Sequence, residues 1–367
     1  YDEALSLLAQ AWLGDDAVKI SSRLCVSFAV RGAMCGLDGE PPKVPYRTPQ
    51  CLQTTPTAAG PTAGDGVEGL VVEEFPLEFE GYVYRHARIA YVKGRPPAPL
   101  ILVHPNYAGL KQFDVDQAAF LARVGYVGLA VDFYREVPEY TYEDRNPPKG
   151  KNKKHHLGAF RLMDELLRTP KFWRRLLGAY LDAANTHPAV RPGLAGAIGY
   201  CFGGQCCLEQ VRAGHNLQAI VTFHGLLQSR PFVNLGQKNQ RRMTSEEFVG
   251  EVDGAKNNYN TQCKVLIENG DYDQEVPSVC IEAWKYEMDA NGIDWRFNNH
   301  ARAPHGFALA PGVWSSEYTE HVDRRSTLSM LSLFSEVWPD YPQHPVETNA
   351  CGTALGQHIT CLGRSKL

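Results

Sequence analysis

Short apolar runs separated by amphipathic stretches recur through the middle of the chain. Runs suited to buried strands lie near residues 100–104, 126–131, 195–200, 218–224, 263–268 and 293–298. Helical spacing of apolar residues fills the intervals between them. Ahead of them, VVEEFPLEF and YVYRHARIAYV alternate apolar and polar residues, which predicts a hairpin that leads into a sheet. Strands that alternate with helices are typical of an α/β fold whose central sheet is mostly parallel and flanked by helices.

The two ends of the chain depart from this pattern. Residues 2–35 carry apolar positions at helical spacing, which predicts two amphipathic helices. Residues 39–66 are rich in Pro, Thr, Gly and Ala, as an extended linker is. The sequence therefore predicts three parts: an N-terminal helical extension with a Pro/Thr-rich linker at 1–66, an α/β domain at 67–340 and a C-terminal tail at 341–367.

One glycine-flanked cysteine stands at the end of a predicted strand. Residues 197–204 read Ala-Ile-Gly-Tyr-Cys-Phe-Gly-Gly. A Gly-x-nucleophile-x-Gly pattern marks a sharp turn from strand to helix that lifts one side chain clear of the sheet. Gly199 and Gly203 lack the Cβ atoms that would clash at so tight a bend. Taken alone, Cys201 is more typical of a buried structural cysteine, so the prediction of a nucleophile depends on its partners.

Two later segments supply an acid and a histidine. In KVLIENGDYDQEVP an apolar stretch ends in a Gly-Asp turn, so Asp271 and Asp273 both follow a strand's C-terminal end. In ARAPHGFALAP, His305 lies in an irregular segment. The order nucleophile, acid, histidine is the order of the α/β-hydrolase fold. Such sheets place their chemistry beyond the carboxyl ends of the strands, so we expect the three segments to meet there.

These motifs together resemble the dienelactone hydrolase family, which has cysteine-dependent members with the α/β-hydrolase fold. The family elbow is matched at 199–204, and its Gly-x-Asp-x-x-Val-Pro segment favours Asp273 over Asp271. Its Gly-His-Ser-Phe-Ala segment is matched loosely around His305, and residues 99–134 resemble its early strand, oxyanion loop and helix. The resemblance covers roughly residues 70–338 and implies an α/β-hydrolase fold with a hydrolase activity.

Two positions depart from the family pattern. Typical members have a glutamate in the oxyanion loop that pairs with the resting cysteine, and Asn106 occupies that place here. They also carry an arginine after the histidine segment that grips the substrate carboxylate, where this chain has Leu309. The resemblance therefore implies the hydrolytic machinery but not the dienelactone substrate.

The predicted chemistry is acyl transfer through a Cys-His-Asp triad. Cys201 would attack an acyl carbon with His305 as its proton partner, and Asp273 would fix the imidazole tautomer. The backbone N–H groups of Phe202 and Tyr107 would hold the oxyanion. The expected function is a hydrolase that cleaves a small ester, lactone or thioester through an acyl-enzyme. The alternative is a catalytically silent α/β-hydrolase relative that serves in binding or assembly.

Other polar features can be explained either by a function or by an ordinary structural role. The insertions 135–157 and 228–260 follow strand ends, where long loops act as lids or are simply solvated. His104 and His224 also end strands on the same side, where either can form a local hydrogen bond. His155-His156 has no acidic or cysteine partner at ligand spacing, so the sequence predicts neither a metal nor a cofactor.

Composition limits the partners. A formal net charge of −4 and a pI near 6.3 give no general attraction to nucleic acid or anionic membranes. No uninterrupted apolar run approaches about 18 residues, so no spanning helix is expected. The expected partner is a small-molecule acyl substrate, with an oligomer through the N-terminal extension left open. The absence of an Asn-x-Ser/Thr sequon favours a cytosolic or organellar chain slightly over a secreted one, and the compartment also stays open.

The ten cysteines divide evenly between the core and the two ends. Besides Cys201, we expect Cys206 and Cys207 to pack as small apolar side chains, and Cys263 and Cys280 lie in core segments. The ends carry five more, which favours disulfides there: Cys25, Cys35, Cys51, Cys351 and Cys361. Because five is odd and spacing does not assign partners, their pairing stays open.

Overall fold

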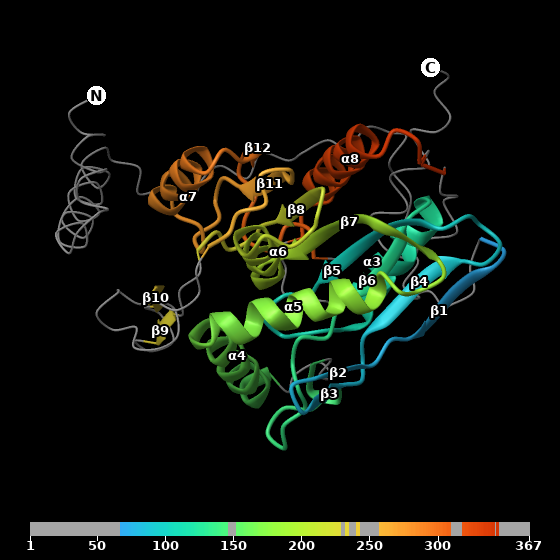
Figure 1. Cartoon of the computed structure of the whole chain (residues 1–367). Coiled ribbons are helices and arrows are strands. Elements are labelled where there is room, and N and C mark those ends of the chain that lie inside the picture. The colour runs from blue at the N-terminus through green and yellow to red at the C-terminus, as the bar shows by residue number, and fades with distance from the viewer. Residues whose placement is uncertain are drawn as a thin grey trace, which may run out of the picture. The chain divides into compact units, whose positions relative to one another are not determined.

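A computed structural model of the chain describes part of its length (Figure 1). The described residues are 67–145, 152–228, 232–234, 240–242, 257–309, 318–341 and 343–344, without the side chains of 152–156, 232–234, 240–242 and 279. They belong to one compact unit that takes in residues 59–367. The predicted N-terminal extension, the C-terminal tail beyond residue 344, the disulfides of both ends and most of the 228–260 insertion lie outside them.

An eight-stranded sheet forms the centre of the unit, in the order β1-β4-β6-β5-β7-β8-β11-β12. Its strands are β1 Leu70–Glu74, β4 Arg88–Val92, β5 Ala98–His104, β6 Val127–Ala130, β7 Val190–Tyr200, β8 Ala219–Phe223, β11 Lys264–Gly270 and β12 Asp294–His300. Every neighbouring pair from β6 to β12 is parallel, while β4 pairs antiparallel with β1 and β6. The expected mostly parallel sheet is therefore confirmed, with its strands near their predicted positions.

The predicted N-terminal hairpin forms in two parts. Its outer strands pair as expected, with Leu70 of β1 opposite Val92 of β4. Its central portion leaves the main sheet and forms a separate small hairpin of β2 Leu77–Phe79 and β3 Tyr82–Tyr84. A second such hairpin, β9 Phe232–Asn234 with β10 Gln240–Arg242, lies within the 228–260 insertion.

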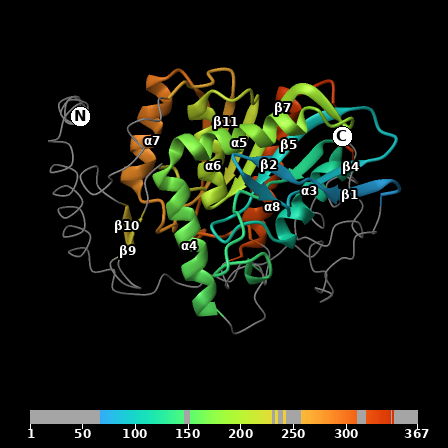
Figure 2. The same ribbon diagram turned by 60° about the horizontal axis from the view of Figure 1, so that its bottom comes forward.

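Helices cover both faces of the sheet (Figure 2). They are α3 Gln112–Val124, α4 Asn152–Arg168, α5 Pro170–Ala184, α6 Phe202–Ala213, α7 Ser278–Ala290 and α8 Glu320–Val337, with a short 3₁₀ turn at Glu143–Arg145. The buried side chains of α4 to α7 belong to one hydrophobic cluster, and those of α3 and α8 belong to another. None of the described helices is long and apolar enough to span a bilayer.

The central strand β5 shows why the sheet needs cover on both sides. All seven of its residues are buried. Leu100 and Leu102 pack into the α4–α7 cluster, whereas Ile101 and Val103 pack into the α3–α8 cluster. A continuous apolar run is expected of a parallel strand with both faces buried, because successive side chains point to opposite faces.

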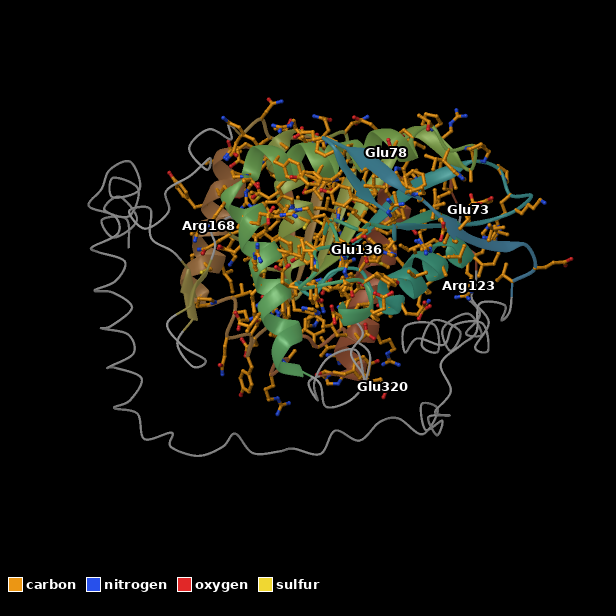
Figure 3. All side chains as sticks on the ribbon, turned by 90° about the horizontal axis from the view of Figure 1, so that it is seen from below. Glu73, Glu78, Arg123, Glu136, Arg168 and Glu320 are labelled. Carbon is orange, nitrogen blue, oxygen red and sulfur yellow. The ribbon has the colours of Figure 1, made fainter. Side chains whose placement is uncertain are left out.

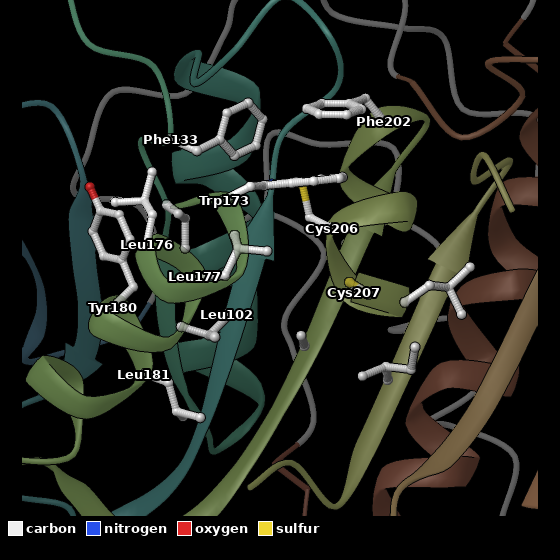
Figure 4. Packing of buried hydrophobic residues seen from close by; sticks show 14 of the residues in the cluster. Leu102, Phe133, Trp173, Leu176, Leu177, Tyr180, Leu181, Phe202, Cys206 and Cys207 are labelled. Atoms are coloured by element: carbon white, nitrogen blue, oxygen red, sulfur yellow. The ribbon is translucent and has the colours of Figure 1, made fainter. Parts of the chain in front are cut away.

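The α4–α7 cluster has an aromatic centre beside α6 (Figure 4). Trp173 of α5 stacks on Phe202 at the start of α6, with ring centroids 5.2 Å apart. Cys206 and Cys207 of α6 are fully buried free thiols in the same cluster. Their predicted role as small apolar packing residues is therefore confirmed, and burial raises the pKa of both thiols well above the ordinary value.

Many charged side chains lie at the rim, but some ion pairs are deeply buried. Glu73, Glu78 and Glu320 are exposed at the edge of the unit (Figure 3). By contrast, the Nη1 atom of Arg145 lies 2.6 Å from Oδ1 of Asp132, and both side chains are at most 1% exposed. Arg145 thereby joins the end of β6 to the start of the 135–157 insertion.

Replacing Arg145 by methionine should therefore lower the free energy of unfolding by about 3–5 kcal/mol, because Asp132 would keep a buried, unpaired charge. The exposed pair Arg175–Glu80 is the matched control, and Arg175→Met should barely move the urea midpoint. Equal small effects of the two substitutions would contradict a structural role for the buried pair.

Candidate functional site

Cys201 occupies a strained turn between β7 and α6. Its backbone has φ 56° and ψ −115°, in a region that non-glycine residues rarely adopt. Two neighbours hold it there, because the Cys201 N–H donates to the Phe223 carbonyl at 3.1 Å and the Leu226 N–H donates to the Cys201 carbonyl at 3.1 Å. Such strain persists only where surrounding contacts stabilise the strained backbone, and it is common at functional sites.

The flanking glycines permit this turn by their lack of a side chain. A Cβ atom on Gly199 would lie 2.1 Å from the Gly203 carbonyl oxygen. A Cβ atom on Gly203 would lie 2.1 Å from the carbonyl oxygen of His104, at the end of β5. Any larger residue would therefore push α6 away from the strands, as the Gly-x-Cys-x-Gly pattern indicates.

His305 contacts Asp273 rather than Asp271. Its Nδ1 atom lies 2.8 Å from Oδ2 of Asp273, whose side chain is fully buried. The other carboxylate oxygen of Asp273 accepts the Glu275 N–H at 2.9 Å. Asp271 is exposed and accepts a hydrogen bond from Asn299 at 2.9 Å. Of the two acids that the sequence offered, the structure thus brings Asp273 to the histidine.

The other side of His305 is coupled to Cys201. Burial alone would lower the pKa of His305, but the charge of Cys201 and hydrogen bonds to Asp273 and Cys201 raise this pKa well above 6.5. These interactions therefore favour the protonated imidazole over the neutral one. The three residues of the predicted triad form one connected group at the carboxyl ends of β7, β11 and β12.

A loop of residues 105–111 after β5 packs beside this group. The Gly109 N–H donates to the Asn106 carbonyl at 2.9 Å, which closes a tight turn over the predicted oxyanion residues. The Tyr134 hydroxyl donates to the Tyr107 carbonyl at 2.9 Å, and the Tyr140 hydroxyl donates to the Ala108 carbonyl at 2.8 Å. Two tyrosines that follow β6 thus fix the backbone of the loop that carries Asn106 and Tyr107.

The described start of the 135–157 insertion therefore has a structural role, because Tyr140 belongs to it. Whether either insertion acts as a lid stays a prediction, since residues 146–151 and most of 228–260 lie outside the described part. The same holds for the side chains of His155 and His156 in α4. Leu309, which stands in place of the family arginine, is buried in the α3–α8 cluster.

The two strand-end histidines differ from each other. His104 forms a local hydrogen bond, with its Nε2 atom 2.8 Å from Oε1 of Gln210. His224 packs edge-on against His305 with ring centroids 5.1 Å apart, and neither of its ring nitrogens has a partner among the described residues. Burial and the nearby His305 hold the pKa of His224 well below 6.5, so its ring is neutral.

Sequence reasoning missed Lys111 altogether. This lysine is only 4% exposed, and its Nζ atom donates to Oδ1 of Asn106 at 2.7 Å. Burial lowers the pKa of Lys111 to about 8, against the attraction of Asp114 and Cys201. Its position inside the oxyanion loop was the available signal, but a lysine between loop and helix is ordinarily solvated.

Comparison with known proteins places this geometry in a family. A model of the dienelactone hydrolase family matches residues 86–338. A probable 2-oxo-3-(5-oxofuran-2-ylidene)propanoate lactonase of Bradyrhizobium sp is 24% identical over 247 residues, which is 63% of this chain and 87% of that protein. An uncharacterized protein of Caenorhabditis elegans is 26% identical over 170 residues, which is 44% of this chain and 92% of that protein.

Solved structures are similar over the same region. The structure titled m3DLH matches with a TM-score of 0.57, and a dienelactone hydrolase-like promiscuous phosphotriesterase from metagenomic libraries matches with 0.56. Both are 25% identical and cover 73% of this chain and 99% of their own. A carboxylesterase of Lactobacillus plantarum, 11% identical with a TM-score of 0.50 over 72% of this chain and 98% of its own, shares the fold.

The geometry predicts a selectively reactive thiol. Iodoacetamide at pH 7 should alkylate Cys201 rapidly, because its thiol is hydrogen-bonded to His305, as an activated nucleophile is to its base. Cys206 and Cys207 have no exposed surface, whereas Cys201 is 8% exposed, so both should stay unmodified in the native protein. Peptide mapping by mass spectrometry measures the rate at each site, and His305→Gln should slow alkylation at Cys201 alone. A slow reaction that His305→Gln does not change would contradict the coupling.

Proposed function

The chain belongs to the dienelactone hydrolase family, and we propose that it hydrolyses small esters, lactones or thioesters with Cys201 as nucleophile. The family and its lactonase relative support hydrolase activity of the esterase or lactonase kind. The observation that carries the cysteine mechanism is the position of His305, hydrogen-bonded to Asp273 on one side and to Cys201 on the other. Covalent acyl transfer requires a nucleophile that contacts a base, and an acid that orients the base.

The first half of the proposed reaction forms an acyl-enzyme. The Cys201 thiolate attacks the acyl carbon, and the carbonyl electron pair moves to the oxygen. Backbone N–H groups of Phe202 and Tyr107 stabilise that oxyanion, together with the positive end of α6. As the tetrahedral intermediate collapses, the bond to the leaving group breaks and the leaving oxygen or sulfur takes the proton of His305.

The second half releases the acid. The neutral His305 now accepts a proton from water, whose oxygen attacks the thioester carbon. The carbon–sulfur bond then breaks, so the carboxylic acid leaves and the Cys201 thiolate and protonated His305 are restored. Asp273 keeps Nδ1 of His305 protonated throughout, which leaves Nε2 for proton transfer.

The replacement of the family arginine by Leu309 indicates the substrate class. A buried leucine offers no bidentate contact to a carboxylate, which the family arginine would supply. We therefore infer that this site takes acyl substrates without a carboxylate next to the reacting bond.

Cys201→Ala should reduce hydrolysis of p-nitrophenyl butyrate to the uncatalysed background while the melting temperature stays nearly constant, because only a sulfur is lost. Cys280→Ala in α7 is the matched control and should keep full activity. Asp273→Asn should lower kcat by at least about 100-fold through loss of the correct imidazole tautomer. Full activity of Cys201→Ala would contradict the proposal. Inactivity of the unmodified chain toward every acyl substrate would favour a binding role.

A substrate panel tests the inference from Leu309. We expect kcat/KM to be higher for neutral short-chain esters and thioesters than for lactones with a carboxylate, the class named for the Bradyrhizobium relative. Steady-state kinetics over the panel, with Cys201→Ala as background, measures the ranking. A carboxylated lactone as best substrate would show that another cation supplies the missing contact.

A further inference from the structure

The side-chain amide of Asn106 has a fixed orientation. One of its two terminal atoms accepts hydrogen bonds from Nζ of Lys111 at 2.7 Å and from the Ala108 N–H at 3.0 Å. Because both partners are donors, that atom is the oxygen, and the amide nitrogen lies on the opposite side. Within the described part of the chain this nitrogen donates to no residue, although Asn106 is only 2% exposed.

Lys111 is held as firmly as the amide that it contacts. Its Nζ atom also lies 3.4 Å from the Gly109 carbonyl, and its backbone N–H donates to Asp114 at 2.8 Å at the start of α3. A buried lysine is costly unless its ammonium is paired and hydrogen-bonded. The ammonium donates its hydrogen bonds to loop 105–111, and the charges of Asp114 and Cys201 also favour it, so the loop and the lysine constrain each other.

This loop abuts the nucleophile elbow. A Cβ atom on Gly203 would lie 2.6 Å from the Pro105 carbonyl oxygen, one residue before Asn106. The charge of Cys201 also interacts electrostatically with the side chains of Tyr107, within the turn, and of Lys111, just after it. Asn106 therefore stands in the part of the loop that borders the reacting sulfur.

We propose that Lys111 is a positioning residue that turns the Asn106 carboxamide so that its nitrogen donates to the carbonyl oxygen of the substrate. The inference rests on the proposed function and adds to it a side-chain donor beside the two backbone N–H groups. The glutamate that typical family members have at this position is an acceptor when ionised, whereas the Asn106 nitrogen is a donor. A donor aimed at the developing oxyanion stabilises the transition state more than the ground state.

Kinetics of four variants test the coupling. With p-nitrophenyl butyrate, Asn106→Ala should lower kcat about 100-fold with little change in KM, because the lost contact forms in the transition state. Lys111→Met should lower kcat in the same way. The double variant should be no slower than Asn106→Ala alone, since Lys111 acts only through Asn106. Lys285→Met in α7, where the half-buried lysine pairs with Glu282, is the lysine control.

Two further measurements distinguish a positioning role of Lys111 from a role in stability, and distinguish failure of this proposal from failure of the cysteine mechanism. Asn106→Asp can still pair with Lys111 but cannot donate, so it should melt like the unmodified chain and show the low kcat of Asn106→Ala. Multiplicative losses in the double variant, or a Lys111→Met protein with a lower melting temperature and unchanged kcat, would overturn the proposal. Activity that survives in Cys201→Ala would instead overturn the proposed function.

Discussion

The site depends on the approach of α6 to the end of β5. Gly203 lies so close to the carbonyl oxygens of His104 and Pro105 that even a methyl group would displace the helix. This contact sets the start of α6, and with it the position of Cys201, against the loop that follows β5. Because the same loop supplies Asn106 and Tyr107, one backbone-to-backbone packing distance fixes the proposed nucleophile relative to its proposed oxyanion donors.

Backbone strain collects at the ends of the sheet strands. Four described non-glycine residues have positive φ, and three of them lie at or just after the ends of sheet strands: Cys201 at 56°, His224 at 42° and Arg302 at 61°. The fourth, Glu80, belongs to the β2–β3 turn. Strained residues cost about 1–3 kcal/mol each and persist where neighbouring contacts over-determine them. The hydrogen bond that the Cys201 N–H donates to β8, and the one that its carbonyl accepts from Leu226, are such contacts.

Local patterns in the sequence predicted most of the fold and the three residues that come together at one edge of its sheet. Strand positions followed from apolar runs, and the meeting of Cys201, Asp273 and His305 followed from parallel strands ending at one edge. The separate β2–β3 hairpin was missed because alternation alone does not show where a strand leaves its sheet. Lys111 was missed because its burial depends on Asn106 and Asp114, whose positions only the folded loop reveals.

Direct observation of the acyl-enzyme tests the central claim, that the chain works through a thioester on Cys201. The chain would be mixed with p-nitrophenyl butyrate, quenched in acid during turnover, digested and mapped by mass spectrometry. The account predicts a butyryl group on the Cys201 peptide that appears within one turnover, is removed by hydroxylamine and is absent from Cys201→Ala. Turnover with no acylated Cys201 at any quench time, or with the acyl group on another residue, would contradict it.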